Sequence, residues 1–146
     1  MEGRGMSRAL TRVALAASGA MLGLIGGVLF VSPQAFLASS GVLVGRDPGL
    51  MSELAAPAGI LLVTGGLMMF GAVRRRFARA GLGAGAIVYG TYGAGRLVSM
   101  ALHGAPQPGL ITATLIELGI AALLAVLWMR EASEPDASRH FDGVTV

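Results

Sequence analysis

Four apolar runs, each long enough to cross a lipid bilayer as a helix, dominate this sequence. They span residues 13–31, 54–73, 80–102 and 109–129. A helix of about 20 apolar residues covers the ~30 Å hydrocarbon core of a membrane. Because backbone groups in lipid must be hydrogen-bonded within the segment, helices are the expected form. We therefore predict an all-α membrane protein, a bundle of four transmembrane helices.

The segments outside these runs are short and more polar. We divide the chain into an N-terminal segment (1–12), a four-helix membrane domain (13–129) and a polar tail (130–146). Charged residues make up only 13% of the chain, whereas a soluble domain carries roughly 25%. The lipid bilayer is thus the main expected partner.

The arginines predict how the chain is oriented in the membrane. The chain has no lysine, and nine of its eleven arginines fall on one side of the predicted membrane domain: Arg4, Arg8, Arg12, Arg74, Arg75, Arg76, Arg79, Arg130 and Arg139. The first connection holds only Arg46, and the third, residues 103–108, holds none. Cytoplasmic loops are enriched in arginine, so we expect both termini in the cytoplasm. Because the basic residues follow membrane orientation, we expect no nucleic-acid partner.

The connections contain helix signals. Ser32 followed by Pro33 is typical of a helix start, and predicts a short interfacial helix. Asp47-Pro48-Gly49 is typical of a turn, and Ser52 is the expected cap of the second membrane helix. Pro106 and Pro108 should separate the third helix from the fourth.

Small residues recur at every fourth position in two of the runs. They are Gly19, Gly23 and Gly27 in the first run, and Ala86, Gly90 and Ala94 in the third. Such faces let membrane helices approach closely. We expect them to serve packing within the chain, and the alternative is a homodimer or partner-protein face.

Polar residues form a stripe on the third run. Tyr89, Tyr92, Arg96, Ser99 and His103 follow a 3, 4, 3, 4 spacing, which places them on one helix face. A polar stripe on a membrane helix should face the bundle or a water-filled cavity.

Arg96 and Glu117 are predicted to form an ion pair between the third and fourth helices. Arg96 lies about 9 Å below the outer end of its helix, and Glu117 about 12 Å below the outer end of the next. An unpaired charge at such a depth costs roughly 3 kcal/mol or more. We expect Glu53 as a second carboxylate near Arg96, and Thr114 as a hydrogen-bonding neighbour of Glu117. The candidate ligand-binding residues are Glu53, Tyr89, Tyr92, Arg96, Ser99, His103, Thr114 and Glu117.

Several of these residues have a purely structural alternative. Glu53 can complement the dipole at a helix start, and His103 can be a surface residue. The tyrosines can be core aromatics with a paired hydroxyl. The Arg96–Glu117 pair itself can be architectural.

Four sequence pieces resemble the bacterial membrane family DUF4345, a domain of unknown function. They are Ser52-Glu53-Leu54, Gly95-Arg96-Leu97-Val98-Ser99, His103-Gly104-Ala105-Pro106 and Ile116-Glu117-Leu118. The resemblance spans roughly residues 8–129. It implies a four-helix fold with a polar cluster, in the inner (plasma) membrane of a bacterium, and it implies no particular activity.

Three functions remain open from the sequence. The first is binding of a small lipid, isoprenoid or quinone-like molecule at the outer-facing polar cluster. The second is a structural or accessory subunit of a membrane complex. The third is an intramembrane acid–base isomerase or cyclase, in which Glu117 or His103 transfers the proton. The chain has no cysteine, and it has no nucleophile elbow, zinc motif or phosphate loop; we therefore expect neither a metal nor a cofactor.

Overall fold

A computed structural model describes the backbone of residues 2–133 and the side chains of residues 5–133. This part of the chain is helical and contains no strand. Its elements are α1 (Glu2–Val31), α2 (Pro33–Ser39), α3 (Pro48–Val73), the single 3-10 turn η1 (Arg75–Phe77), α4 (Ala78–His103) and α5 (Pro108–Ser133). The all-α prediction is confirmed for these residues. Residues 134–146, most of the predicted polar tail, lie outside the described part.

Three of the described helices are long and apolar enough to cross a membrane. They are the segments Gly5–Val31 of α1, Pro48–Val73 (α3) and Pro108–Ser133 (α5). The remaining long helix, α4, has 26 residues, like α3 and α5. It is less apolar because it contains Arg79 and Arg96 among many glycines and alanines. Length and composition therefore give this chain the character of a membrane protein.

The helices extend beyond the apolar runs that predict them. α1 begins at Glu2, and α3 begins at Pro48, inside the segment that we predicted as a turn. Asp47 caps α3, since its Oδ1 atom accepts a hydrogen bond from the backbone N–H of Leu50 over 2.8 Å. The prediction of Ser52 as the cap is wrong, because an aspartate directly before a proline already supplies a cap one turn earlier.

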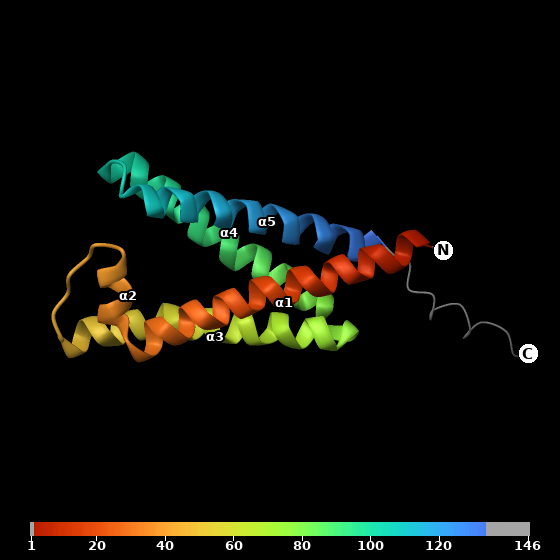
Figure 1. Ribbon diagram of the computed structural model, residues 1–146, viewed down its shortest axis with the longest axis horizontal. Coiled ribbons are helices and arrows are strands. Elements are labelled where there is room, and N and C mark those ends of the chain that lie inside the picture. Colours follow the sequence, from red (N-terminus) through yellow and green to blue (C-terminus); the bar gives the residue numbers. More distant parts are fainter. Residues whose placement is uncertain (1, 134–146) are drawn as a thin grey trace, which may run out of the picture.

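The short helix predicted after Ser32 is confirmed. Ser32 occupies the N-cap position of α2 and Pro33 its first turn, although the Ser32 side chain makes no capping hydrogen bond. Pro33 is buried and Phe36 packs against the core, so α2 is anchored rather than free. In Figure 1, α2 lies across the chain at the end where α1 stops and α3 begins.

The long helices form two pairs that diverge toward one end. α1 packs along α3 and α4 packs along α5, while α3 also contacts α4 next to the η1 turn. Figure 1 shows the pairs close together near η1 and apart near α2 and the α4–α5 connection. The start of α1 and the end of α5 lie at the same, closed end (Figure 1). We call the end with α2 and the α4–α5 connection the open end.

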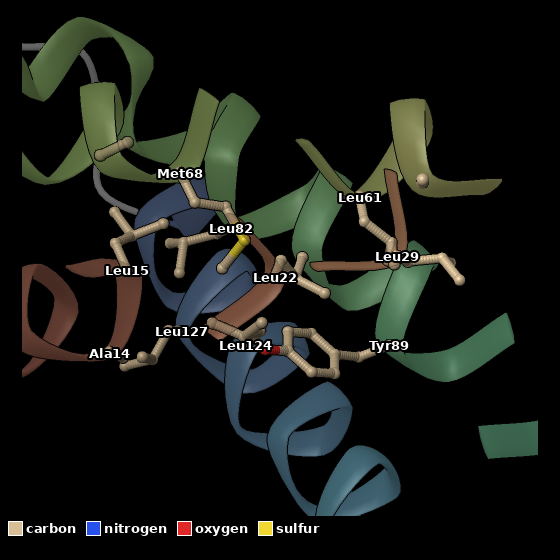
Figure 2. Packing of buried hydrophobic residues seen from close by; sticks show 12 residues of the cluster. Ala14, Leu15, Leu22, Leu29, Leu61, Met68, Leu82, Tyr89, Leu124 and Leu127 are labelled. Carbon is tan, nitrogen blue, oxygen red and sulfur yellow. The ribbon is translucent and has the colours of Figure 1, made fainter. Parts of the chain in front are cut away.

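The core lies toward the closed end, where all four long helices contribute. Leu15, Met68, Leu82 and Leu124 are completely buried there, one from each long helix. Figure 2 shows these side chains gathered around Met68, with Leu127 and Tyr89 beside them. Full burial of a leucine or methionine side chain stabilises a soluble protein by ~1.5–3 kcal/mol. In lipid the gain comes from close packing instead.

The small residues that permit the closest helix contacts differ partly from those we predicted. In α1, Gly19 and Gly26 face the backbone of α3, whereas a Cβ atom on Gly23 or on Gly27 would meet nothing within 4 Å. Gly23 still contacts α3 through its backbone, because a Cβ atom on Gly65 would lie 2.8 Å from the Gly23 nitrogen. The prediction is wrong for Gly27, because seven residues complete almost two turns of a 3.6-residue helix and eight overshoot them. In α4, Gly85 and Gly93 make the tight contacts, whereas a Cβ atom on the predicted Gly90 would meet only Ala121, at 3.8 Å.

Candidate functional site

A cavity of about 450 Å³ lies between the two diverging helix pairs. Its walls come from all five helices and from the α4–α5 connection. The apolar lining residues include Met21, Leu22, Ile25, Phe36, Leu61, Val88, Leu110 and Ile116. The polar lining residues are Ser39, Ser40, Tyr89, Tyr92, Arg96, Gln107, Thr112 and Glu117. This volume falls in the range of small-molecule pockets, about 300–1,000 Å³.

The predicted ion pair is present and lines this cavity. Arg96 Nε lies 3.2 Å from Glu117 Oε2, joining α4 to α5. The side chains are 32% and 13% exposed. The two paired atoms are shielded from solvent, yet they do not reach the angles of a hydrogen bond. The attraction between them is therefore mainly charge–charge, and it is strengthened by the low dielectric around it.

Two strong donors near the pair remain available to a bound molecule. The other guanidinium nitrogens of Arg96 make no hydrogen bond to any described residue, and neither does the hydroxyl of Tyr92, one turn away on α4. Tyr92 is half-buried and lines the same cavity. Arginine has five N–H donors and no acceptor. The cavity thus presents N–H and O–H groups beside the Arg96–Glu117 charge pair.

Tyr89 is a structural member of the cavity wall. Its hydroxyl donates a hydrogen bond to the backbone carbonyl of Ser18 over 2.9 Å, and both residues are buried. The bond ties α4 to α1 at the point where the helix pairs begin to diverge, close to the packed core (Figure 2). Because its hydroxyl is already hydrogen-bonded, Tyr89 is a core aromatic residue with a paired hydroxyl, which was the structural alternative given for it above.

The structure leaves four of the other candidate residues outside the cavity. Thr114 is buried, but its hydroxyl donates to the carbonyl of Leu110 in its own helix and not to Glu117. Ser99, His103 and Glu53 are exposed and do not line the cavity. Glu53 makes no ion pair with Arg96, because α3 begins on the diverging pair, away from α4 (Figure 1).

Sequence reasoning missed the contribution of the first connection and of α2. Phe36, Ser39 and Ser40 line the cavity together with Gln107 from the α4–α5 connection. A Cβ atom on Gly41 would collide with the side-chain amide of Gln107, and Gly41 has a φ of +75°. Glycine adopts this backbone conformation without strain. The two connections therefore meet at the cavity mouth, and no local pattern in the sequence indicated this long-range contact.

No metal centre is evident among residues 2–133. This part of the chain contains no group of three histidine, aspartate or glutamate side chains close enough to hold an ion. The cavity's donor set is a guanidinium, a phenol, an amide and hydroxyls, with one carboxylate. Such a set suits an organic head group better than a metal.

Comparison with known proteins finds a matching family. A family model described as a domain of unknown function (DUF4345) matches residues 10–129. The matched region includes the Arg96–Glu117 pair and every residue that lines the cavity. No curated protein and no solved structure matches the chain.

Proposed function

This chain belongs to DUF4345, a family without an assigned function, and we propose that it is a four-span membrane protein that holds a small lipid-like molecule in the cavity between its helix pairs. The proposed location is the inner (plasma) membrane of a bacterium. The observation that carries the proposal is the cavity of about 450 Å³ in which Arg96, Glu117 and Tyr92 meet apolar walls.

The proposal includes α4 as the fourth span. A helix of 26 residues is about 39 Å long, enough to cross the hydrocarbon core. α4 packs along the apolar helix α5 and contacts α3. The inner part of its polar stripe, Tyr89, Tyr92 and Arg96, lines the cavity between the helix pairs. Polar side chains that face the bundle are the arrangement that lipid permits.

The orientation follows from arginine placement. η1 and the residue before it hold Arg74, Arg75 and Arg76, at the end where α1 starts and α5 finishes (Figure 1). Arginine-rich ends remain in the cytoplasm. The cavity mouth, with α2 and the α4–α5 connection, then faces outward.

Single-cysteine labelling tests both the orientation and the number of spans. The chain contains no cysteine, so the introduced cysteine is the only residue that the reagent can label in each variant. We expect a membrane-impermeant maleimide to label Gly45→Cys and Ala105→Cys in intact spheroplasts, and Ser133→Cys only after lysis. Gly45 and Ala105 flank the α3–α4 hairpin, so labelling of one without the other would show that only one of these helices crosses the membrane. If only Ser133→Cys were labelled in intact spheroplasts, the protein would have the opposite orientation in the membrane.

The chemistry of the cavity selects a class of ligand. Because Glu117 neutralises Arg96, the cavity favours a head group that is uncharged and accepts hydrogen bonds, such as a carbonyl or hydroxyl oxygen. Leu22, Ile25 and Val88 offer apolar contact for a short hydrocarbon portion. An isoprenoid alcohol, a quinone or a small neutral lipid has both an uncharged oxygen that accepts hydrogen bonds and a hydrocarbon portion.

Filling the cavity should remove such a ligand. Ala113 lines the cavity, while Ala122 lies exposed on the same helix and does not. Ala113→Phe should lower the amount of co-purifying small lipid, measured by native mass spectrometry, by about tenfold, which corresponds to ~1.4 kcal/mol. Ala122→Phe adds the same side chain outside the cavity and should retain the lipid.

A milder variant keeps this test valid if Ala113→Phe misfolds. Tyr92→Phe removes only the unpaired hydroxyl and should weaken lipid retention by roughly fivefold. Equal retention in wild type, Ala113→Phe and Tyr92→Phe would rule out the cavity as the binding place.

A structural subunit is the second candidate, and the Arg96–Glu117 pair favours it. The pair joins α4 and α5 with both contacting atoms shielded, as expected of a contact that sets helix register. A variant with leucine at both positions separates the two functions. If it folds and binds a partner protein as before, and no lipid is found in the wild type, the pair is architectural.

A further inference from the structure

A second hollow lies at the opposite, closed end of the chain, with a volume of about 540 Å³. It is formed where the start of α1 meets the end of α3, η1, the start of α4 and the end of α5. Its lining residues are Gly5, Arg8, Ala9, Thr11, Arg12, Val13, Gly71, Arg75, Ala78 and Glu131. None of them lines the first cavity, so the two spaces are separate.

Three arginines and one glutamate line this hollow, so its lining carries more positive than negative charge. Arg8 and Arg12 are one helical turn apart on α1, and Arg75 comes from η1. Neither Arg8 nor Arg12 forms an ion pair with a described residue. Like charges one turn apart repel each other and destabilise a helix. An anion between the guanidinium groups of Arg8 and Arg12 would relieve that repulsion.

Thr11 supplies a further hydrogen-bond donor to this hollow. The residue is only 4% exposed and lines the hollow, and its hydroxyl makes no hydrogen bond to a described residue. Thr91, Thr112 and Thr114 each donate to the carbonyl four residues earlier in their own helix. Thr11 and Thr64 do not, and of these two only Thr11 lines this space. The Thr11 hydroxyl is therefore free to donate a hydrogen bond to a molecule in the hollow.

We propose that this hollow binds a singly negative phosphate, in the form of the head group of an anionic phospholipid in the adjacent leaflet. Arginine pairs with phosphate through two parallel N–H bonds, and the Thr11 hydroxyl can donate a third hydrogen bond. Glu131 lines the same space and opposes a second negative charge, which favours a phosphodiester over a phosphate monoester. Val13, Gly71 and Ala78 provide an uncharged wall beside it. Basic pockets between membrane helices are suited to such head groups. This inference does not rest on the function proposed for the first cavity.

Lipid-resolved native mass spectrometry tests the proposal on the full-length protein. Phosphatidylglycerol and phosphatidylcholine are added separately to the detergent-solubilised protein. We expect one phosphatidylglycerol to bind at least about tenfold more tightly than phosphatidylcholine. Arg12→Gln should abolish this preference, and Thr11→Val, which keeps the shape of the side chain, should reduce it by about fivefold.

Arg74→Gln is the matched control. Arg74 lies at the same end of the chain and is exposed, but it does not line the hollow. It should leave the preference within about twofold, because it removes the same charge from outside the site. Thermal unfolding of each variant, followed through Trp128 fluorescence, checks that the fold is kept.

A competition with excess inorganic phosphate distinguishes the two sources of the anion. If inorganic phosphate binds at the site and displaces the lipid in an Arg12-dependent manner, the site exists but serves a free phosphate ion. If it leaves bound phosphatidylglycerol in place, the lipid is the ligand. Equal losses in Arg12→Gln and Arg74→Gln, or no preference for phosphatidylglycerol in the wild type, would show a diffuse positive surface and overturn the proposal.

Discussion

Replacing Glu117 with leucine should destabilise the protein by ~3 kcal/mol, because the variant leaves Arg96 charged and unpaired between α4 and α5. In the wild type the two paired atoms are shielded from solvent, while the side chains as a whole are 32% exposed for Arg96 and 13% for Glu117. This partial exposure places the expected loss near the lower end of the range for buried pairs. The free energy of unfolding in mixed micelles, measured by denaturant titration, gives the value directly.

The two single variants of the pair should not be equivalent. Arg96→Leu should cost less than Glu117→Leu, since a carboxylate can escape burial as a charge by taking up a proton and a guanidinium cannot. The variant with leucine at both positions should recover most of the stability, because two leucines pack without any desolvation cost. A double variant as unstable as the sum of the singles would mean that the two charges do not interact.

Gly65→Ala should give the second large effect, a loss of ~2–3 kcal/mol or failure to fold. A Cβ atom at this position would lie 2.7 Å from the carbonyl oxygen of Gly19 and 2.8 Å from the backbone nitrogen of Gly23. Both atoms belong to the α1 backbone, which cannot rotate away as a flexible side chain can. Relief would require α1 and α3 to move apart along their whole contact, and close approach is the main attraction between helices in lipid.

Gly66→Ala is the matched control for that prediction. It is the neighbouring residue of the same helix, and a Cβ atom there would meet nothing within 4 Å. We expect its stability to lie within ~0.5 kcal/mol of wild type or slightly above it, given the helix preference of alanine. The same thermal and denaturant measurements apply to both variants. Similar stabilities for the two would show that α1 and α3 are not as closely packed as the structure has them.

The ion pair could be predicted from the sequence because it depends on quantities that a helix makes regular. The rise of 1.5 Å per residue sets the depth of each charge below its helix end. The high cost of a lone charge in lipid then leaves pairing as the only inexpensive arrangement. The observed 3.2 Å contact between Arg96 and Glu117 confirms that reasoning. The short helix after Ser32 was predictable for a similar reason, since Pro33 fixes a helical φ locally.

The exposure of Glu53, Ser99 and His103 outside the cavity could not be predicted in the same way. A helix face defines only a direction, and whether anything lies in that direction depends on how the helices cross. Here the α1–α3 pair diverges from the α4–α5 pair (Figure 1), so residues near the open end of the polar stripe and of α3 are exposed. The cavity residues of α2 were missed for the same reason, because α2 enters the space that this divergence leaves.

The sequence by itself determined that the chain is helical, which runs are apolar enough for lipid, and which two charges had to meet. Each of these follows from local hydrogen bonding or from the energy of a charge in an apolar solvent, and both are properties of short segments. Only the tertiary structure decided that the helices pair two by two and diverge, that Gly65 and Gly85 are points of contact, and that a cavity and a basic hollow lie at opposite ends. Those features depend on side-chain shapes across helices far apart in the chain, which no local pattern records.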